Sequence, residues 1–124
     1  MVNKQDYLNA INQNIDMVRG DTLAFNFVLG GLGRLEEYNA LSITFAVAEH
    51  YEEAIIFQST KGDGISLEKY NIDKDQAVFS VFVAPRKTES LDTGRYYYDL
   101  QIKTNSNTLT LMRGILTLLY DVTN

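Results

Sequence analysis

The stretch "RYYYDLQIK", Arg95 to Lys103, decides the fold class of this chain. Apolar and aromatic side chains take every second position in it, and polar or charged ones take most of the places between. One set is Tyr96, Tyr98, Leu100 and Ile102, and the other is Tyr97, Asp99, Gln101 and Lys103. A period of two puts the first set on one face of a strand, whereas a helix would need a period near 3.6. The stretch therefore predicts a half-buried β-strand with Tyr97 facing outward.

The same alternation recurs along most of the chain. It runs through Leu23 to Leu29, Leu41 to Val47, Ala77 to Val83 and Thr108 to Tyr120, with a short apolar segment from Ala54 to Phe57. Turn signals separate these segments: "KGDG" at Lys61 to Gly64, "TNSN" at Thr104 to Asn107, and Pro85, which ends a strand because it has no N–H. Six or seven short strands predict an all-β domain and favour an antiparallel two-sheet sandwich over a barrel.

The last predicted strand changes its parity midway. Leu109 and Leu111, before Gly114, share one parity, whereas Leu116, Leu118 and Tyr120, after it, share the other. One extra residue in a strand restores the apolar set to the core face, and glycine accepts the dihedral angles of such an insertion. We therefore predict a β-bulge at Gly114.

Length, charge and composition narrow the function classes. A chain of 124 residues fits one domain, and the absence of cysteine leaves no disulfide or thiolate metal site and suits a cytosol. The net charge is −5 and the basic residues are scattered, whereas nucleic-acid binding needs a positive field. The longest apolar run is too short to span a bilayer. We expect a soluble protein that binds neither nucleic acid nor a membrane.

No group of residues points to catalysis or to a metal. His50 is the sole histidine, and no nucleophile is placed beside it by the sequence. The carboxylates of "KGDG" and of "NIDKD", Asn71 to Asp75, lack the ligand spacing of a calcium loop. We expect no enzyme activity and no cofactor.

Acidic residues gather between Leu35 and Thr60, a segment without lysine or arginine. They are Glu36, Glu37, Glu49, Glu52 and Glu53. The simpler interpretation is a solvated edge or loop. The alternative is a docking face for a basic partner, formed by Glu36, Glu37, Glu52 and Glu53.

Arg19-Gly20-Asp21 is the tripeptide by which some proteins bind cell-surface adhesion receptors. Here strand-like residues flank it closely on both sides, which predicts a tight turn and not a protruding loop. We expect Gly20 to supply a positive φ, Asp21 to bond neighbouring backbone amides, and Arg19 to pair with a carboxylate such as Asp99.

The segment Asp92-x-Gly94-x-Tyr96-x-Tyr98 resembles the entry to the sixth strand of immunoglobulin domains, which reads D-x-G/A-x-Y-x-C. The resemblance implies that the Tyr96 hydroxyl bonds back to the backbone at a corner. It also implies that Tyr98 stands in the position of the cysteine, face to face with Phe27 in the core. The expected fold is an immunoglobulin-like sandwich.

A wider pattern resembles small bacteriophage and prophage virion domains, of which the amino-terminal domain of the upper baseplate protein of phages of Gram-positive bacteria is one. The matching segments are Arg19 to Thr22, Gly94 to Gln101, Leu109 to Gly114 and Asp121 to Thr123. The resemblance implies a non-enzymatic structural subunit of tail, baseplate or head, made in the bacterial cytoplasm. Its partners would be other virion proteins in symmetric, multi-copy assembly. The alternative is a free-standing module that binds a carbohydrate or a host protein.

Residues 1–10 form a predicted arm that precedes the single β-sandwich domain, residues 11–124. The arm is polar apart from a few groups, among them Tyr7 and Leu8, which have no evident place in a sandwich core. A helix this short is marginal on its own. We therefore expect the arm to be mobile in the isolated subunit and to dock on a neighbouring one through Tyr7 and Leu8.

Overall fold

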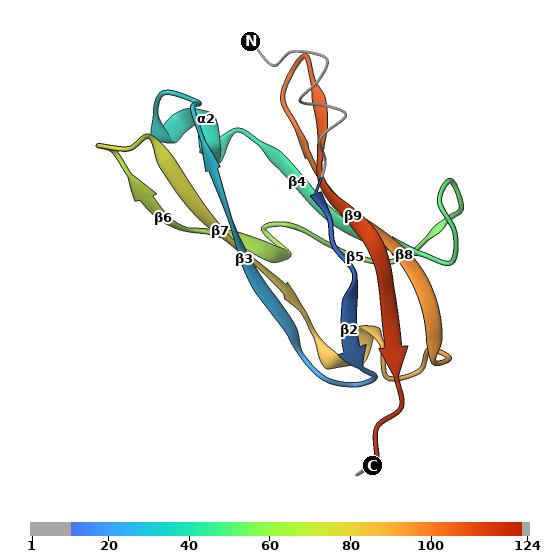
Figure 1. Ribbon diagram of the computed structural model, residues 1–124. Coiled ribbons are helices and arrows are strands. Elements are labelled where there is room, and N and C mark those ends of the chain that lie inside the picture. Colours follow the sequence, from blue (N-terminus) through green and yellow to red (C-terminus); the bar gives the residue numbers. More distant parts are fainter. Residues whose placement is uncertain (1–10, 123–124) are drawn as a thin grey trace.

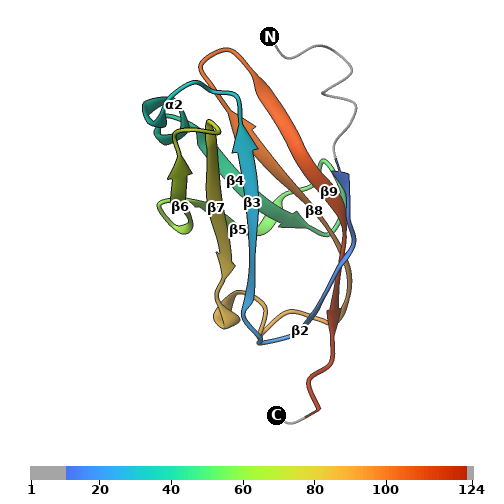
Figure 2. The ribbon, with the colours of Figure 1, turned by 60° about the vertical axis from the view of Figure 1, so that its left-hand side comes forward.

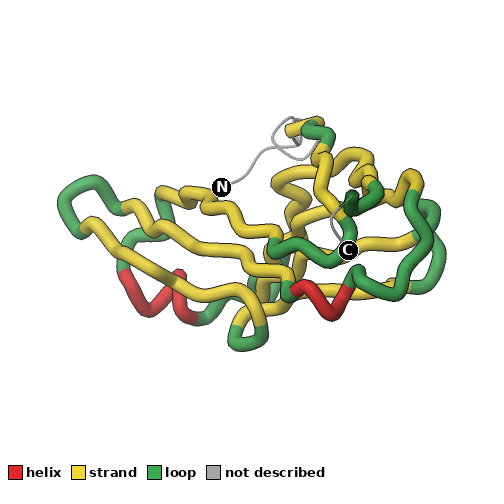
Figure 3. Tube along the Cα trace, turned by 90° about the horizontal axis from the view of Figure 1, so that it is seen from below, coloured by secondary structure: helices red, strands yellow, loops and turns green. Residues whose placement is uncertain are grey.

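The computed structural model describes residues 11–122, and strands make up most of them (Figures 1 and 3). The strands are β1 (Ile11–Asn12), β2 (Ile15–Val18), β3 (Leu23–Gly30), β4 (Ser42–Ala48), β5 (Ile55–Lys61), β6 (Gly64–Asn71), β7 (Gln76–Val83), β8 (Gly94–Lys103) and β9 (Thr108–Leu119). Two short helical turns accompany them, α2 (Leu35–Asn39) and η1 (Pro85–Lys87). The all-β prediction is confirmed. The predicted arm, with Tyr7 and Leu8, lies outside the described residues.

The strands of residues 11–122 form one curled, nine-stranded sheet (Figure 2). Its order is β1-β9-β8-β4-β5-β6-β7-β3, and β2 also pairs with β9. Most neighbours are antiparallel, but β1 and β2 run parallel to β9, and β5 runs parallel to β6 over two residue pairs. The sheet is therefore mixed and not wholly antiparallel as predicted, because alternation fixes which face a side chain takes but not the direction of the neighbouring strand.

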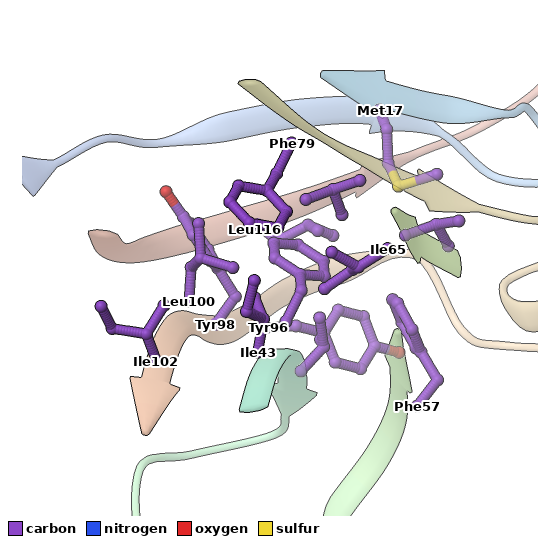
Figure 4. Close-up of a cluster of buried hydrophobic side chains, with 14 of the residues drawn as sticks. Met17, Ile43, Phe57, Ile65, Phe79, Tyr96, Tyr98, Leu100, Ile102 and Leu116 are labelled. Atoms are coloured by element: carbon purple, nitrogen blue, oxygen red, sulfur yellow. The ribbon is translucent and has the colours of Figure 1, made fainter. Parts of the chain in front are cut away.

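The core lies on the inner side of the curl, where strands from both halves of the sheet meet (Figure 4). Phe45 and Val47 of β4, Phe79 and Val81 of β7 and Leu100 of β8 have no exposed surface. Each fully buried side chain of this size contributes about 1.5–3 kcal/mol relative to an exposed one. The inward set of β8 that the alternation predicted is buried throughout.

The predicted bulge in β9 exists, but three residues before its predicted place. Leu100 pairs with Met112 and Gln101 pairs with Thr110, so Leu111 is the inserted residue. The parity change reports that the strand contains an inserted residue but not which one, and here it is Leu111, a member of the first leucine set. Gly114 has another role: a Cβ there would overlap the carbonyl oxygen of Gln13 in the β1–β2 link, which crosses β9 closely.

The short helix α2 and the strand β6 are among the elements that the sequence did not predict. Five residues are too few for a helix to be stable by itself. Tyr38 holds α2 in place: its ring is fully buried, and its hydroxyl accepts a bond from the Leu32 N–H and lies 2.8 Å from the carbonyl and a carboxylate oxygen of Asp75. The helix thus depends on a residue in the β6–β7 turn.

Candidate functional site

The Arg19-Gly20-Asp21 segment is the tight turn that joins β2 to β3. The Asp21 N–H donates to the Val18 carbonyl oxygen at 3.0 Å, and Gly20 has a φ of 83° in the left-handed region that favours glycine. The predicted turn is confirmed. The Gly20 N–H, however, donates to the Thr88 hydroxyl oxygen at 2.9 Å, so a residue distant in sequence takes the role predicted for Asp21.

The Arg19 side chain is directed back onto the protein. One guanidinium nitrogen donates to the Leu91 carbonyl oxygen at 3.2 Å, and another lies 3.4 Å from an Asp121 carboxylate oxygen. The predicted partner Asp99 is wrong, because Asp99 lies farther along β8 and faces its outer side. The Arg19 guanidinium therefore bonds within the domain and connects the β2–β3 turn to the segment that follows β9.

The corner predicted at the entry to β8 is present. The Tyr96 hydroxyl donates to the Asp92 carbonyl oxygen at 2.6 Å, four residues upstream. This bond closes the loop that leads into β8 and fixes the register at which the strand begins.

The predicted face-to-face contact between Tyr98 and Phe27 is wrong. Tyr98 packs on Phe45 with ring centroids 5.3 Å apart, and Phe27 stacks on Phe79 at 5.4 Å. Phe45 in turn meets Phe25 edge-on at 5.6 Å. The contact across the core therefore runs from β3 through β4 to β8. The sequence did not predict this role of Phe45. The alternation around Phe45 shows which face of the strand it takes but not which strands lie opposite.

The four glutamates of the predicted acidic face are not brought together. Glu36 and Glu37 lie in α2, where Arg34 approaches their carboxylates to 3.9 and 3.4 Å. Glu52 and Glu53 lie in the loop that follows β4. Because α2 precedes β4 and the loop follows it, the two pairs stand at opposite ends of a seven-residue strand (Figure 1), about 20 Å apart at roughly 3.3 Å per residue.

A groove runs over the outer face of β4, between β8 and β5, and encloses about 340 Å³. Its floor consists of small side chains that alternate along β4: Ser42, Thr44, Ala46 and Ala48. Longer side chains rise on both sides, Tyr97, Asp99, Gln101 and Lys103 from β8 and Gln58 from β5. The groove exists because a row of small residues lies between two rows of larger ones.

The loop after β4 closes one end of this groove. The Tyr51 ring packs on the Tyr97 ring at 4.7 Å, and its hydroxyl donates to the Gly114 carbonyl oxygen at 3.2 Å. The Arg113 guanidinium lies over the Tyr51 ring, 4.5 Å from its centroid, and His50 lies 5.6 Å from Tyr97. The outward direction of Tyr97 was predicted by parity. Tyr51 and Arg113 were not, because a loop and a bulged strand give no periodic signal.

Asp99 is the half-buried carboxylate of the groove. Burial raises the pKa of Asp99, and the positive charge of Arg113 on the paired strand opposes that rise. Arg113 nevertheless forms no ion pair with Asp99 within residues 11–122, since its guanidinium is stacked on Tyr51. The nearest polar contact is the Gln101 amide nitrogen at 3.5 Å. Asp99 therefore faces the groove with hydrogen-bonding capacity to spare.

The opposite half of the sheet has an open edge at β3. Within the described part of the chain β3 pairs only with β7. Its eight residues include no proline and no charged side chain. Its inward side chains remain partly exposed. On the outer face Val28, which pairs with Val78, is 57% exposed, and Phe82 of β7, which pairs with Ala24, is 47% exposed. This apolar edge was not located by the sequence, which cannot tell an edge strand from a central one.

Neither a metal centre nor a membrane span is evident in residues 11–122. No three His, Asp or Glu side chains of this range are grouped so that they could hold an ion, and none of its helices is long and apolar enough to cross a bilayer. No family model matches the chain, and the search of curated proteins gave no match.

Proposed function

We propose that this chain is a non-enzymatic structural subunit of a bacteriophage virion, of tail, baseplate or head, which acts by assembling with other virion proteins. We further propose that its sheet is an immunoglobulin-like sandwich, with β3, β7 and β6 as one layer and β9, β8, β4 and β5 as the other. The Tyr96 corner supports the sandwich, as does the link between the layers, which consists of only two residue pairs between β5 and β6.

The free edge of β3 is the observation that carries the assembly role. An edge strand presents a row of unpaired N–H and C=O groups, and folded proteins commonly block it with charge, proline or a covering segment. β3 carries neither charge nor proline over its eight residues. A strand from a partner that paired here would satisfy those groups and cover the half-exposed side chains of Phe25 and Phe27.

The outer face beside this edge favours a protein partner. Ala24 is opposite Phe82, and Val28 is opposite Val78, so apolar pairs flank a polar centre at Asn26. An open ladder provides directional hydrogen bonds to a protein partner, and the exposed apolar groups beside it provide non-directional hydrophobic contact. The resemblance to virion domains supports the same role. The segments that carry it form the turn into β3 and much of β8 and β9.

Two lysines at the edge, in Ala24→Lys/Val28→Lys, test this proposal. Both positions are exposed, so the monomer should keep its stability to within about 0.5 kcal/mol by chemical denaturation. Ile72→Lys/Val122→Lys is the matched control, with the same added charge at exposed residues outside β3 and its partner β7.

The measurement is mass spectrometry of virions induced from a strain that encodes the chain. We expect the unaltered protein and the control in many copies per particle, and the edge variant to be absent or strongly depleted. If the unaltered protein is absent from particles, the virion role is wrong. If the edge variant is incorporated as well as the control, β3 is not the assembly surface.

A further inference from the structure

We propose that the groove over β4, between Tyr97 and Asp99 on one side and Gln58 on the other, binds a short neutral oligosaccharide. This site goes beyond the assembly role and does not rest on it. It lies on the outer face of β8, β4 and β5, whereas the assembly edge is at the far end of the sheet order (Figures 1 and 2).

The shape of the groove fits a small, elongated ligand. Its volume of about 340 Å³ is at the lower end of the range of roughly 300–1,000 Å³ for small-molecule sites. The small side chains of its floor follow β4 from Ser42 to Ala48, so the free space extends along the strand. A ligand of one to a few sugar rings, laid lengthwise, would contact the floor and both walls.

The polar groups match a hydroxyl-rich ligand. Asp99 accepts hydrogen bonds through two oxygens, and neighbouring hydroxyls of a sugar ring supply donors in pairs. Gln101 and Gln58 carry amides that both donate and accept, as do the Thr44 and Ser42 hydroxyls. Asp99 is already partly buried, with one weak contact from the Gln101 amide. A hydrogen bond from a ligand hydroxyl would therefore not require Asp99 to give up a strong bond to the protein.

The aromatic end matches the apolar face of a sugar ring. Tyr51 is 39% exposed at the rim of the groove, and Tyr97 and the alanines of β4 continue the apolar surface inward. The Tyr51 ring is held by its bond to Gly114 and by Arg113. A ring fixed before the ligand arrives loses little conformational entropy on binding.

Charge and strand pairing favour a neutral glycan over an anionic glycan and over a peptide. Three carboxylates line the groove, Glu52, Glu53 and Asp99, against one lysine, Lys103, so the local field disfavours an anionic ligand. An extended peptide would gain little, because β4 is paired on both sides, with β5 and β8, and offers no free ladder to its main chain.

The test is an array of neutral oligosaccharides of hexoses and N-acetylhexosamines, followed by calorimetric titration of the best-bound compound. Asp99→Asn removes the negative charge and replaces one of the two acceptor oxygens by an amide donor, and Ala46→Leu fills the floor without deleting any polar group. We expect each to weaken binding at least tenfold, with thermal midpoints showing that both fold. The edge variant Ala24→Lys/Val28→Lys serves as control and should bind normally.

Failure to bind any neutral glycan, binding of anionic glycans or peptides alone, or undiminished affinity in Ala46→Leu would overturn the proposal. These results separate it from the assembly role. A protein that is abundant in particles but binds no neutral glycan keeps the virion function and loses the groove. A protein that binds a glycan but is absent from particles does the reverse.

Discussion

The strands β8 and β3 carry the same alternation, but their inward side chains are buried to different extents. In β8 the inward tyrosines, Tyr96 and Tyr98, are buried, the latter to 1% exposure. In β3 the inward phenylalanines, Phe25 and Phe27, remain partly exposed. Among the described residues, β8 has β4 and β9 as neighbours, whereas β3 has β7 alone. Alternation thus sets the face that a side chain takes, and the number of neighbouring strands sets how much of it is covered.

The largest effect expected from this difference is on stability. Tyr98→Ala should lower the free energy of unfolding by about 3–5 kcal/mol, the range for a fully buried large aromatic. It also leaves the Gln13 carbonyl oxygen without the hydroxyl that it accepts from. Phe27→Ala should cost only about 1–2 kcal/mol, because part of the ring already meets solvent. Denaturant titration of the two variants measures the difference. Equal losses of stability would show that the number of neighbouring strands does not determine how far the two rings are covered.

Two glycines, Gly114 in β9 and Gly30 in β3, should show a similar difference in the backbone. Gly114→Ala in β9 must displace the β1–β2 link, because its Cβ would overlap the Gln13 carbonyl oxygen, and should cost about 1–3 kcal/mol. Gly30→Ala at the end of β3 is the control, since its Cβ comes no closer than 3.3 Å to Asp75 and the edge can yield. Thermal denaturation should rank Gly114→Ala well below Gly30→Ala in stability, and the reverse order would contradict the close crossing at Gly114.

Much of the strand framework could be predicted because each of those strands carries its own signal. The alternation of β3, β4, β7 and β8 is local, and so are the turn at Gly20 and the corner at Tyr96. β6 was missed because Glu68 and Lys69 interrupt its apolar set, where the register with β7 shifts. Alternation of apolar residues can be recognised without knowing the partner strand, and β6 lacks a clear alternation.

Other missed features depend on partners distant in the sequence. α2 forms because Tyr38 reaches Asp75, and the groove is closed by Tyr51 on Tyr97 and Gly114. The contact across the core uses Phe45, whose neighbours follow from strand order alone. Strand order is set by tertiary packing, so residue patterns within one strand do not contain it.

A smaller effect is expected at the corner of β8. Tyr96→Phe keeps the ring and removes the hydroxyl that donates to Asp92, so the loss should be about 1 kcal/mol, typical of one hydrogen bond. The same change at Tyr120, an exposed residue beyond β9, should have almost no effect. Paired denaturation curves measure both, and an unaltered Tyr96→Phe would mean that the corner bond does not hold the entry to β8.

The outer face of β8 should show a pH-dependent effect of still smaller size. Burial raises the pKa of Asp99 in the folded state, so the folded state favours the protonated carboxyl. This contribution to stability is fully present below the unfolded pKa, near 3.9, and is lost as the pH rises through the folded pKa. Asp99→Asn does not titrate. It should therefore gain stability relative to the unaltered protein between pH 3 and pH 7, as measured by denaturation at both, and an opposite trend would contradict the burial.

Amide hydrogen exchange, followed by mass spectrometry on peptides that cover β3 and β8, tests most directly whether β3 is an open edge that assembly closes. In the free protein β3 should exchange much faster than β8, because one side of its ladder is unpaired. In assembled particles β3 should become protected while β8 stays slow. Slow exchange of β3 in the free protein, or unchanged exchange after assembly, would contradict the role proposed for this edge.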